Sequence, residues 1–161
     1  MLALPSPRPA RIAIIGVGNQ LNGDDGAGPH VVRELAARLP ATPGLLLLDG
    51  GLAPENFSGP LRRFRPDLVL QIDAADQGRP PGATAWIDWQ EADGLSASTH
   101  TLPPSVFAKF LIAELGCRVA LIGIQPAVLE LNAPLSPAVD RACSELADAL
   151  GKWLTAAEVP R

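Results

Sequence analysis

Short apolar runs alternate along the chain with stretches in which apolar residues recur at helical spacing. Five apolar runs predict β-strands: residues 11–18, residues 44–51 with the strand ending at Asp49, residues 67–76 with the strand ending near Asp73, and residues 82–89 and 117–126. The first of them, RIAIIGVG, is rich in β-branched residues, which is typical of a strand buried on both faces. The fourth, GATAWIDW, carries more polar residues and is expected at a sheet edge.

Three stretches predict helices. Pro29 suits the first turn of a helix that follows the first strand, because proline there loses no hydrogen bond. Residues 103–116 form a second helix that Gly116 can end. A third begins at Ser136 and Pro137, where we expect a serine cap followed by a first-turn proline.

Strands that alternate with helices indicate an α/β fold. We expect a three-layer sandwich with a mostly parallel, five-stranded, twisted sheet and helices on both faces. The length of 161 residues suggests a single domain, with a core at about residues 11–154. The tails, residues 1–9 and 156–161, are expected to fray.

Composition narrows the class of protein. The hydrophobic content of 47% and charged content of 19% fit a folded protein. The net charge is −4, so nucleic acid is not an expected partner. The short basic run at residues 62–65 is interpreted as a surface turn. Neither a signal peptide nor a membrane-spanning apolar run is evident, which predicts a cytoplasmic protein without membrane contact. The two cysteines, Cys117 and Cys143, are far apart and are expected in the core.

Polar residues gather in the loops that follow the predicted strands. In sheets of this class, ligands bind beyond the carboxyl ends of the strands. Clustered carboxylates repel one another, so such a cluster needs a cation, a proton or wide separation. The residues in these loops are Asn19, Asp24 and Asp25 after the first strand, Asp49, Gly50 and Gly51 after the second, and Asp73 and Asp76 after the third.

His100 lies in a polar loop, STHT, without helical periodicity. One imidazole and two carboxylates would form a mixed site that nickel or zinc accepts. Alternatively, each aspartate caps a helix or holds a turn, which we prefer for Asp24 and Asp76, and His100 has a structural role in its loop. The other histidine, His30, is expected to be a surface or capping group on the first helix.

Other chemistries find less support. The glycine-rich loop GNQLNGDDGAG departs from G-x-G-x-x-G, and its paired acids would repel a pyrophosphate. A nucleotide-binding α/β domain is therefore disfavoured, although nucleotide titration would test it. No G-x-S-x-G or H-E-x-x-H motif is present, so the sequence supplies no evident nucleophile or zinc-protease helix.

Five segments, GVGNQLNGDDGAGP, LLLDGGLAPEN, VLQIDAADQGRPPG, STHTLP and LIGIQP, resemble in order the motifs of the hydrogenase maturation endopeptidases. The resemblance extends from about Arg11 to about Trp153. The details GGLAPEN and GIQP are most similar to the branch that processes the hydrogenase of the formate hydrogenlyase complex. The first nine residues lie outside the match and are expected to be dispensable.

The resemblance implies roles for individual residues. Asp25, Asp73 and His100 correspond to the family's metal ligands and catalytic residues. Asp49, Gly50 and Gly51 correspond to its DGG loop, and with Asn19 they are expected to recognise substrate. The implied metal is nickel, supplied by or shared with the substrate, and we expect that zinc or cadmium can also occupy the site.

The implied function is a nickel-dependent endopeptidase. It would remove the C-terminal extension of a nickel–iron hydrogenase large-subunit precursor after nickel insertion. A metal-sensing chaperone that binds the same subunit without cutting it would share the ligands, so the sequence does not separate the two. We expect the free protein to be a monomer.

Overall fold

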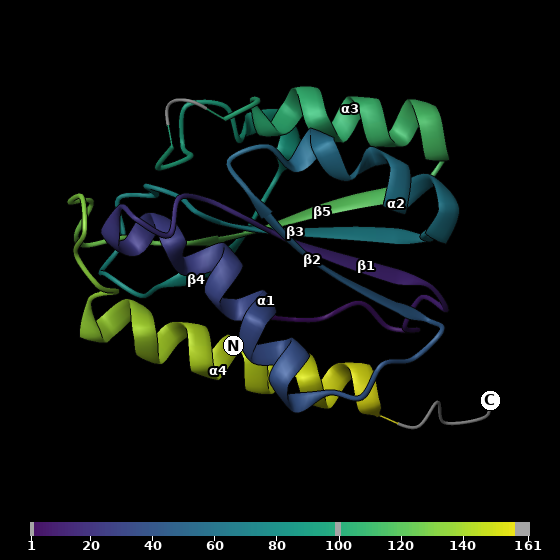
Figure 1. Cartoon of the computed structure of the whole chain (residues 1–161), viewed down its shortest axis with the longest axis horizontal. Coiled ribbons are helices and arrows are strands. Elements are labelled where there is room, and N and C mark those ends of the chain that lie inside the picture. The colour runs from purple at the N-terminus through teal and green to yellow at the C-terminus, as the bar shows by residue number, and fades with distance from the viewer. Residues whose placement is uncertain (1, 99–100, 157–161) are drawn as a thin grey trace.

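The computed structural model describes residues 2–98 and 101–156. A five-stranded sheet lies between two layers of helices (Figure 1), which confirms the predicted α/β sandwich. The strands are β1 (Ile12–Val17), β2 (Leu45–Gly51), β3 (Leu68–Ala74), β4 (Thr84–Ile87) and β5 (Arg118–Ile124). The α-helices are α1 (Ala27–Arg38), α2 (Ser58–Phe64), α3 (Pro104–Leu115) and α4 (Pro137–Thr155), and the short 3-10 helices are η1 (Gly23–Gly26), η2 (Pro54–Phe57) and η3 (Trp89–Glu91).

The strand order is β2-β1-β3-β5-β4. All neighbours pair in parallel except β4, which runs antiparallel to β5 at one edge, as its polar pattern predicted. From β1 the chain moves outward to β2 and then returns past β1 to β3. The order therefore reverses between β1 and β3, and this switch point is where such sheets bind ligands.

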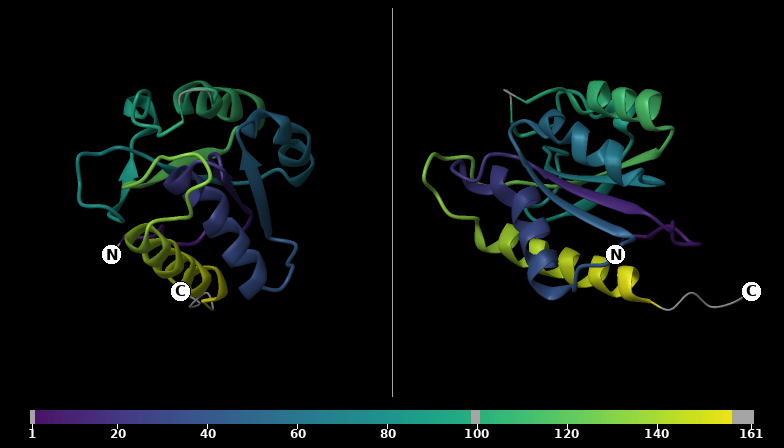
Figure 2. Two further views of the ribbon diagram at one scale, coloured as in Figure 1. Left: turned by 60° about the vertical axis from the view of Figure 1, so that its left-hand side comes forward. Right: turned by 45° about the vertical axis from the view of Figure 1, so that its right-hand side comes forward.

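The side chains on the two faces of β1 pack into two separate apolar cores. Ile12 and Ile14 pack with α1 and α4, whereas Ala13 and Ile15 pack with α2 and α3. Figures 1 and 2 show these helix pairs on opposite sides of the sheet. Because a strand's side chains alternate between faces, a sheet covered on both sides requires the continuous apolar run seen in the sequence.

The helix α2 differs from the sequence prediction, which placed a surface turn at residues 62–65. Arg62 and Arg63 instead form the last turn of α2, and Arg65 ends it in the left-handed conformation, with φ 53°. Arg62 donates to Glu114 on α3 over 3.1 Å and lies above the ring of Phe110. The helix has only seven residues, so it shows no apolar repeat from which it could be recognised.

The first residues of the chain pack against the domain, so the expectation that residues 2–9 fray is wrong. The indole nitrogen of Trp86 donates to the Ala3 carbonyl over 3.1 Å, and that of Trp153 donates to the Pro5 carbonyl over 3.0 Å. Leu2 and Leu4 pack on the core shared by α1 and α4. This short segment lacks any helical or strand periodicity, and its burial depends on partners from distant parts of the chain.

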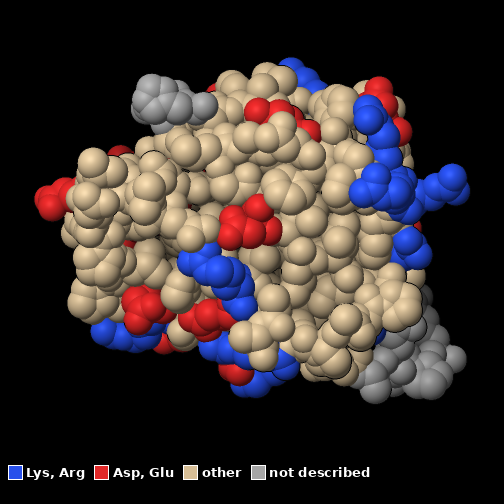
Figure 3. Space-filling model, viewed as in Figure 1, with Lys and Arg blue, Asp and Glu red and all other residues tan. Residues whose placement is uncertain are grey.

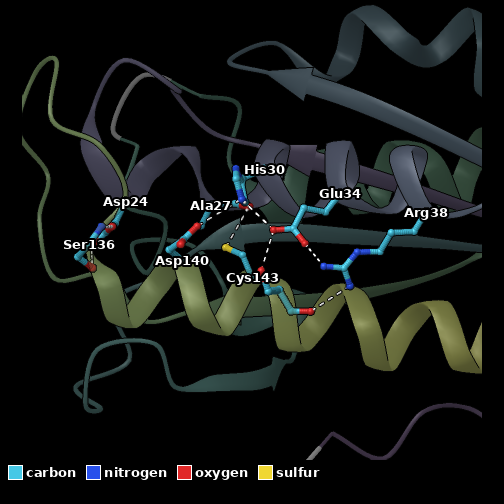
Figure 4. A network of polar contacts seen from close by, with 9 residues as sticks. Asp24, Ala27, His30, Glu34, Arg38, Ser136, Asp140 and Cys143 are labelled. Carbon is cyan, nitrogen blue, oxygen red and sulfur yellow. Dashed lines mark hydrogen bonds and ion pairs between the residues drawn. The ribbon is translucent and has the colours of Figure 1, made fainter.

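A polar network joins α1 to α4 (Figure 4). Nε2 of His30 lies 3.0 Å from Oε1 of Glu34 and 3.5 Å from Oδ1 of Asp140. The Ser144 hydroxyl donates to Glu34 over 2.9 Å, and Arg38 pairs with the other oxygen of that carboxylate. His30 thus links two helices instead of capping one. No helix in the described part of the chain is both long and apolar enough to cross a membrane.

Candidate active site at the carboxyl edge of the sheet

The loop after β1 turns tightly and delivers Asp25 to the end of the strand. Gly18 has φ 141°, and a Cβ atom there would lie 1.9 Å from the Asp25 carbonyl oxygen, so only glycine fits. The Asn19 amide donates to Oδ2 of Asp25 over 3.0 Å. Asp25 is buried in η1, directly before α1, and its other oxygen, Oδ1, has no hydrogen-bond partner.

Asp73 is the penultimate residue of β3, the strand next to β1, and is also buried. The hydroxyl of Ser96 donates to its Oδ2 over 2.9 Å. Its Oδ1, like that of Asp25, is buried without a partner. The structure therefore brings two of the three predicted ligands to the switch point, each with one unsatisfied carboxylate oxygen.

The two carboxylates resist ionisation. Burial raises the pKa of Asp25, and the hydrogen bond from the Asn19 amide opposes that rise. The pKa of Asp73 is raised to about 8: burial is the largest cause, the Ser96 hydrogen bond opposes it, and the charge of Asp25 adds to it. A pair of buried acids with elevated pKa values is typical of a functional site.

The unsatisfied oxygens fit a cation. A buried carboxylate oxygen without a donor is costly, and a metal ion or a shared proton would remove that cost. Within residues 2–98 and 101–156, no group of three His, Cys, Asp or Glu side chains forms a ready metal site. The third predicted ligand, His100, lies outside the described residues. The donor set of Asp25 and Asp73 is therefore compatible with a mixed nitrogen and oxygen site, but it is a partial one.

The described chain before His100 is anchored beside Asp73. Ser96 forms an antiparallel bridge with Ala75, and the Ala97 amide donates to the Ala74 carbonyl over 2.9 Å. The Asp76 amide donates to the Leu95 carbonyl over 2.7 Å. These contacts hold residues 95–97 at the end of β3.

The DGG segment ends β2 and adjoins the first loop. The Gly18 amide donates to the Gly51 carbonyl over 2.8 Å. Asp49 is exposed and accepts from the Gln20 side chain over 2.8 Å and from Arg33 over 3.3 Å. Asp49 is thus accessible beside the Asp25 loop, whereas Gly50 is buried and Gly51 is half-buried. The recognition roles of these residues and of Asn19 stay predictions.

Asp24 and Asp76 have structural roles, as preferred from the sequence. Asp76 accepts from the Gly78 amide and from the Gln125 side chain, which holds a turn after β3. Asp24 is buried and accepts from the loop that precedes α4. Ser136 is the N-cap residue of α4 and Pro137 follows it, as expected, but the Ser136 hydroxyl makes no capping hydrogen bond and donates to Asp24 over 2.9 Å.

Cysteine chemistry is disfavoured at this site. Cys117 and Cys143 are both buried, as predicted. Burial raises the pKa of Cys117, and it raises that of Cys143 to about 12, with nearby carboxylates adding to the effect. A thiol that resists ionisation is a poor nucleophile.

Ser96 belongs to the candidate site but could not be identified from the sequence. In the sequence it is one of three hydroxyl residues in the polar run SASTH, and each of the three could hydrogen-bond to a site residue. Its partner Asp73 lies 23 residues earlier in the chain. Nothing in the local sequence distinguishes Ser96 from Ser98. Only the antiparallel bridge between Ser96 and Ala75 shows which of the two lies beside Asp73.

The fold and the acidic pair define a doubly wound α/β protein with a carboxylate site at its switch point. A sequence model described as hydrogenase maturation protease matches residues 29–153. The hydrogenase 3 maturation protease of Escherichia coli is 33% identical over 141 residues, covering 87% of this chain and 88% of that protein. The chain belongs to the hydrogenase maturation protease family and is therefore a peptidase.

Solved structures agree with this assignment. The HycI maturation protease of Thermococcus kodakarensis has a TM-score of 0.84 at 33% identity, covering 93% of this chain and 96% of that one. The HybD maturating endopeptidase of E. coli has a TM-score of 0.74 at 25% identity, covering 87% and 89%. The resemblance seen in the sequence is confirmed, including its closeness to the formate hydrogenlyase branch, since the matching sequence model and the T. kodakarensis structure are both of HycI proteases.

Proposed function

We propose that this protein is a nickel-dependent endopeptidase that removes the C-terminal extension of a nickel–iron hydrogenase large-subunit precursor after nickel insertion. The observation that carries the proposal is the pair Asp25 and Asp73, two buried acids at the switch point with one unsatisfied oxygen each. Family membership supports the peptidase activity and the class of substrate. The protein would act as a cytoplasmic monomer.

In this proposal the metal belongs to the substrate. Asp25, Asp73 and His100 would ligate nickel carried by the precursor, so that cutting depends on completed metal insertion. Zinc or cadmium would be able to substitute at the same ligands. A bound metal can polarise a carbonyl or acidify a water. Binding would draw a proton from Asp73, whose pKa near 8 keeps it largely neutral at pH 7.

The residues around the pair have separate tasks. The Asn19 amide and the Ser96 hydroxyl each hold one oxygen of an acid, which leaves the other oxygen free for ligation. The DGG segment, through its accessible Asp49, would contact the substrate chain. A water activated by a carboxylate or the metal would attack the scissile bond, since the described cysteines are buried. A covalent acyl-enzyme trapped during turnover would contradict this route.

The test uses purified large-subunit precursor with and without nickel. Mass spectrometry should show loss of the C-terminal extension only in the nickel-loaded sample. Asp25→Asn and His100→Ala should abolish that loss while circular dichroism shows an intact fold. Normal trimming by both variants would exclude the proposed site. A precursor that binds but keeps its mass would favour the non-proteolytic chaperone.

A further inference from the structure

Exposed leucines gather at the same edge of the sheet as the acidic pair. The side chains of Leu21, Leu129 and Leu131 are 63%, 44% and 72% exposed, in the loops after β1 and β5. Single exposed leucines are common on proteins, whereas a cluster of them marks an interaction surface. We name these three residues the leucine platform.

The two loops of the platform are joined by backbone hydrogen bonds. The Asn132 amide donates to the Leu21 carbonyl, and the Asp24 amide donates to the Val128 carbonyl, each over 2.7 Å. A Cβ atom at Gly23, where φ is 58°, would lie 2.4 Å from the Val128 carbonyl oxygen. Glycine is therefore needed for the loops to approach this closely, and the leucines are adjacent because of it.

The buried carboxylate of Asp24 fixes the loop after β5. Its two oxygens accept from the amides of Ala127 and Val128, each over 2.8 Å, and from the amide and hydroxyl of Ser136. These hydrogen bonds satisfy amides that would otherwise be unpaired, and they hold the loop in one conformation. The backbone under the leucine platform is thus held in place, while the leucine side chains are exposed to solvent.

The platform is continuous with the candidate active site. Asn19 donates its amide to Asp25 and accepts the Leu21 amide on its own side chain over 3.0 Å. Asp24, which holds the platform, directly precedes Asp25. In Figure 3 the left end of the molecule is mostly uncharged, with acidic side chains at its left margin. The exposed Glu130 lies between Leu129 and Leu131 in the sequence, so the platform carries a negative charge among its leucines. An apolar surface beside a peptidase site suits a protein substrate.

We propose that the leucine platform docks an apolar surface of the hydrogenase large-subunit precursor, next to the segment that is cut. The inference rests on the proposed function for the identity of the partner. A rigid platform costs little conformational entropy on binding, so its three leucines can add affinity for a folded substrate. The acidic pair would then select the metal, and the platform would select the protein that carries it.

The test compares wild type with the double variant Leu129→Ser, Leu131→Ser on purified nickel-loaded precursor. KM for trimming should rise roughly ten-fold or more, with kcat nearly unchanged, because exposed leucines contribute binding area only in the complex. The control is Ile112→Ser on α3, whose side chain is 37% exposed and lies outside the platform. Its KM should equal that of the wild type, and melting temperatures should verify that all the proteins are folded.

Precursor binding is measured separately by biolayer interferometry, so that docking and cutting can fail independently. Trimming with unchanged KM in the double variant would overturn the platform and leave the protease intact. Binding without trimming by the wild type, lost in the double variant, would overturn the protease and support the platform. Sedimentation that shows self-association of the wild type, abolished in the double variant, would assign the platform to a second copy and overturn the proposal.

Discussion

The charge of Asp25 raises the pKa of Asp73, so the two acids at the ends of β1 and β3 form one electrostatic unit. Each is anchored through one oxygen, Asp25 by the Asn19 amide and Asp73 by the Ser96 hydroxyl. Replacing one of the two acids with a neutral residue should therefore change the pKa of the other acid. The same two pKa values affect both the stability of the fold and metal binding, because acids that are neutral in the folded protein must lose their protons to ligate a metal.

The stability of the metal-free protein should fall as the pH rises. The folded-state pKa of Asp73, about 8, lies above its ordinary value of 3.8. The folded protein thus binds more protons than the unfolded chain between these values, and the stabilisation present at low pH is lost as the pH rises through 8. Urea unfolding with a chelator should show this decline between about pH 5 and about pH 8, by on the order of 1–3 kcal/mol from Asp73.

The matched variant for this measurement is Asp73→Asn. It keeps the shape of the side chain but cannot ionise, so its stability should decline less over the same pH range. At the upper end of the range it should be more stable than the wild type. Parallel pH profiles for the two proteins would show that Asp73 ionises normally in the fold.

Adjacent aspartates should respond in opposite ways to the same substitution. Asp24→Asn should lower the free energy of unfolding by about 2–4 kcal/mol, because an amide cannot accept all the hydrogen bonds that the buried carboxylate receives. Asp25→Asn should retain wild-type stability or exceed it, since it removes a desolvated acid, yet it should abolish trimming. Chemical denaturation and the precursor assay separate the two, and an equal loss of stability would refute the division.

Ser96 should act as a positioning residue for Asp73. Its hydrogen bond lowers the pKa of that acid, so Ser96→Ala should raise the pKa further and weaken trimming several-fold. Carbon NMR of the aspartate carboxyl groups measures the shift directly. Ser96→Thr keeps the hydroxyl and should restore both readouts, and Ser98→Ala, two residues later, serves as control. A normal Asp73 titration in Ser96→Ala would contradict this role.

Most of the fold follows from the apolar pattern because each strand is long enough to show it. The run at β1 is buried on both faces, the adjacent strand β3 is buried throughout, and β5 is buried over its last four residues. The helix α2 has no such repeat: Gly59 and Pro60 interrupt its seven residues and only Leu61 is fully enclosed. Short elements of this kind are determined by tertiary contacts, which periodicity does not encode.

The sequence predicts those parts of the site that follow from the position of strand ends in a parallel sheet, and it does not predict those parts that depend on contacts between distant segments. Asp25 lies in the loop after β1 and Asp73 near the end of β3, and the carboxyl ends of these parallel strands must share one edge, so the convergence of the two acids could be expected. The difference between Asp24 and Asp25 is set by Val128 and its neighbours, about a hundred residues later in the sequence. Ser96 likewise depends on a bridge to Ala75 that spacing cannot predict.

Deleting residues 1–9 should destabilise the protein, although these residues lie outside the family resemblance. The deletion removes Leu2 and Leu4 from the core and leaves the indole nitrogens of Trp86 and Trp153 without their carbonyl acceptors. The expected loss is about 2–4 kcal/mol, from two partly buried leucines and two hydrogen bonds. Leu2→Ser with Leu4→Ser in the full chain should reproduce the apolar part of the loss. Because the segment packs on α4, away from Asp25 and Asp73, trimming by the remaining folded protein should persist at low temperature. Urea unfolding curves that coincide for the truncated and full chains would show that the segment contributes nothing.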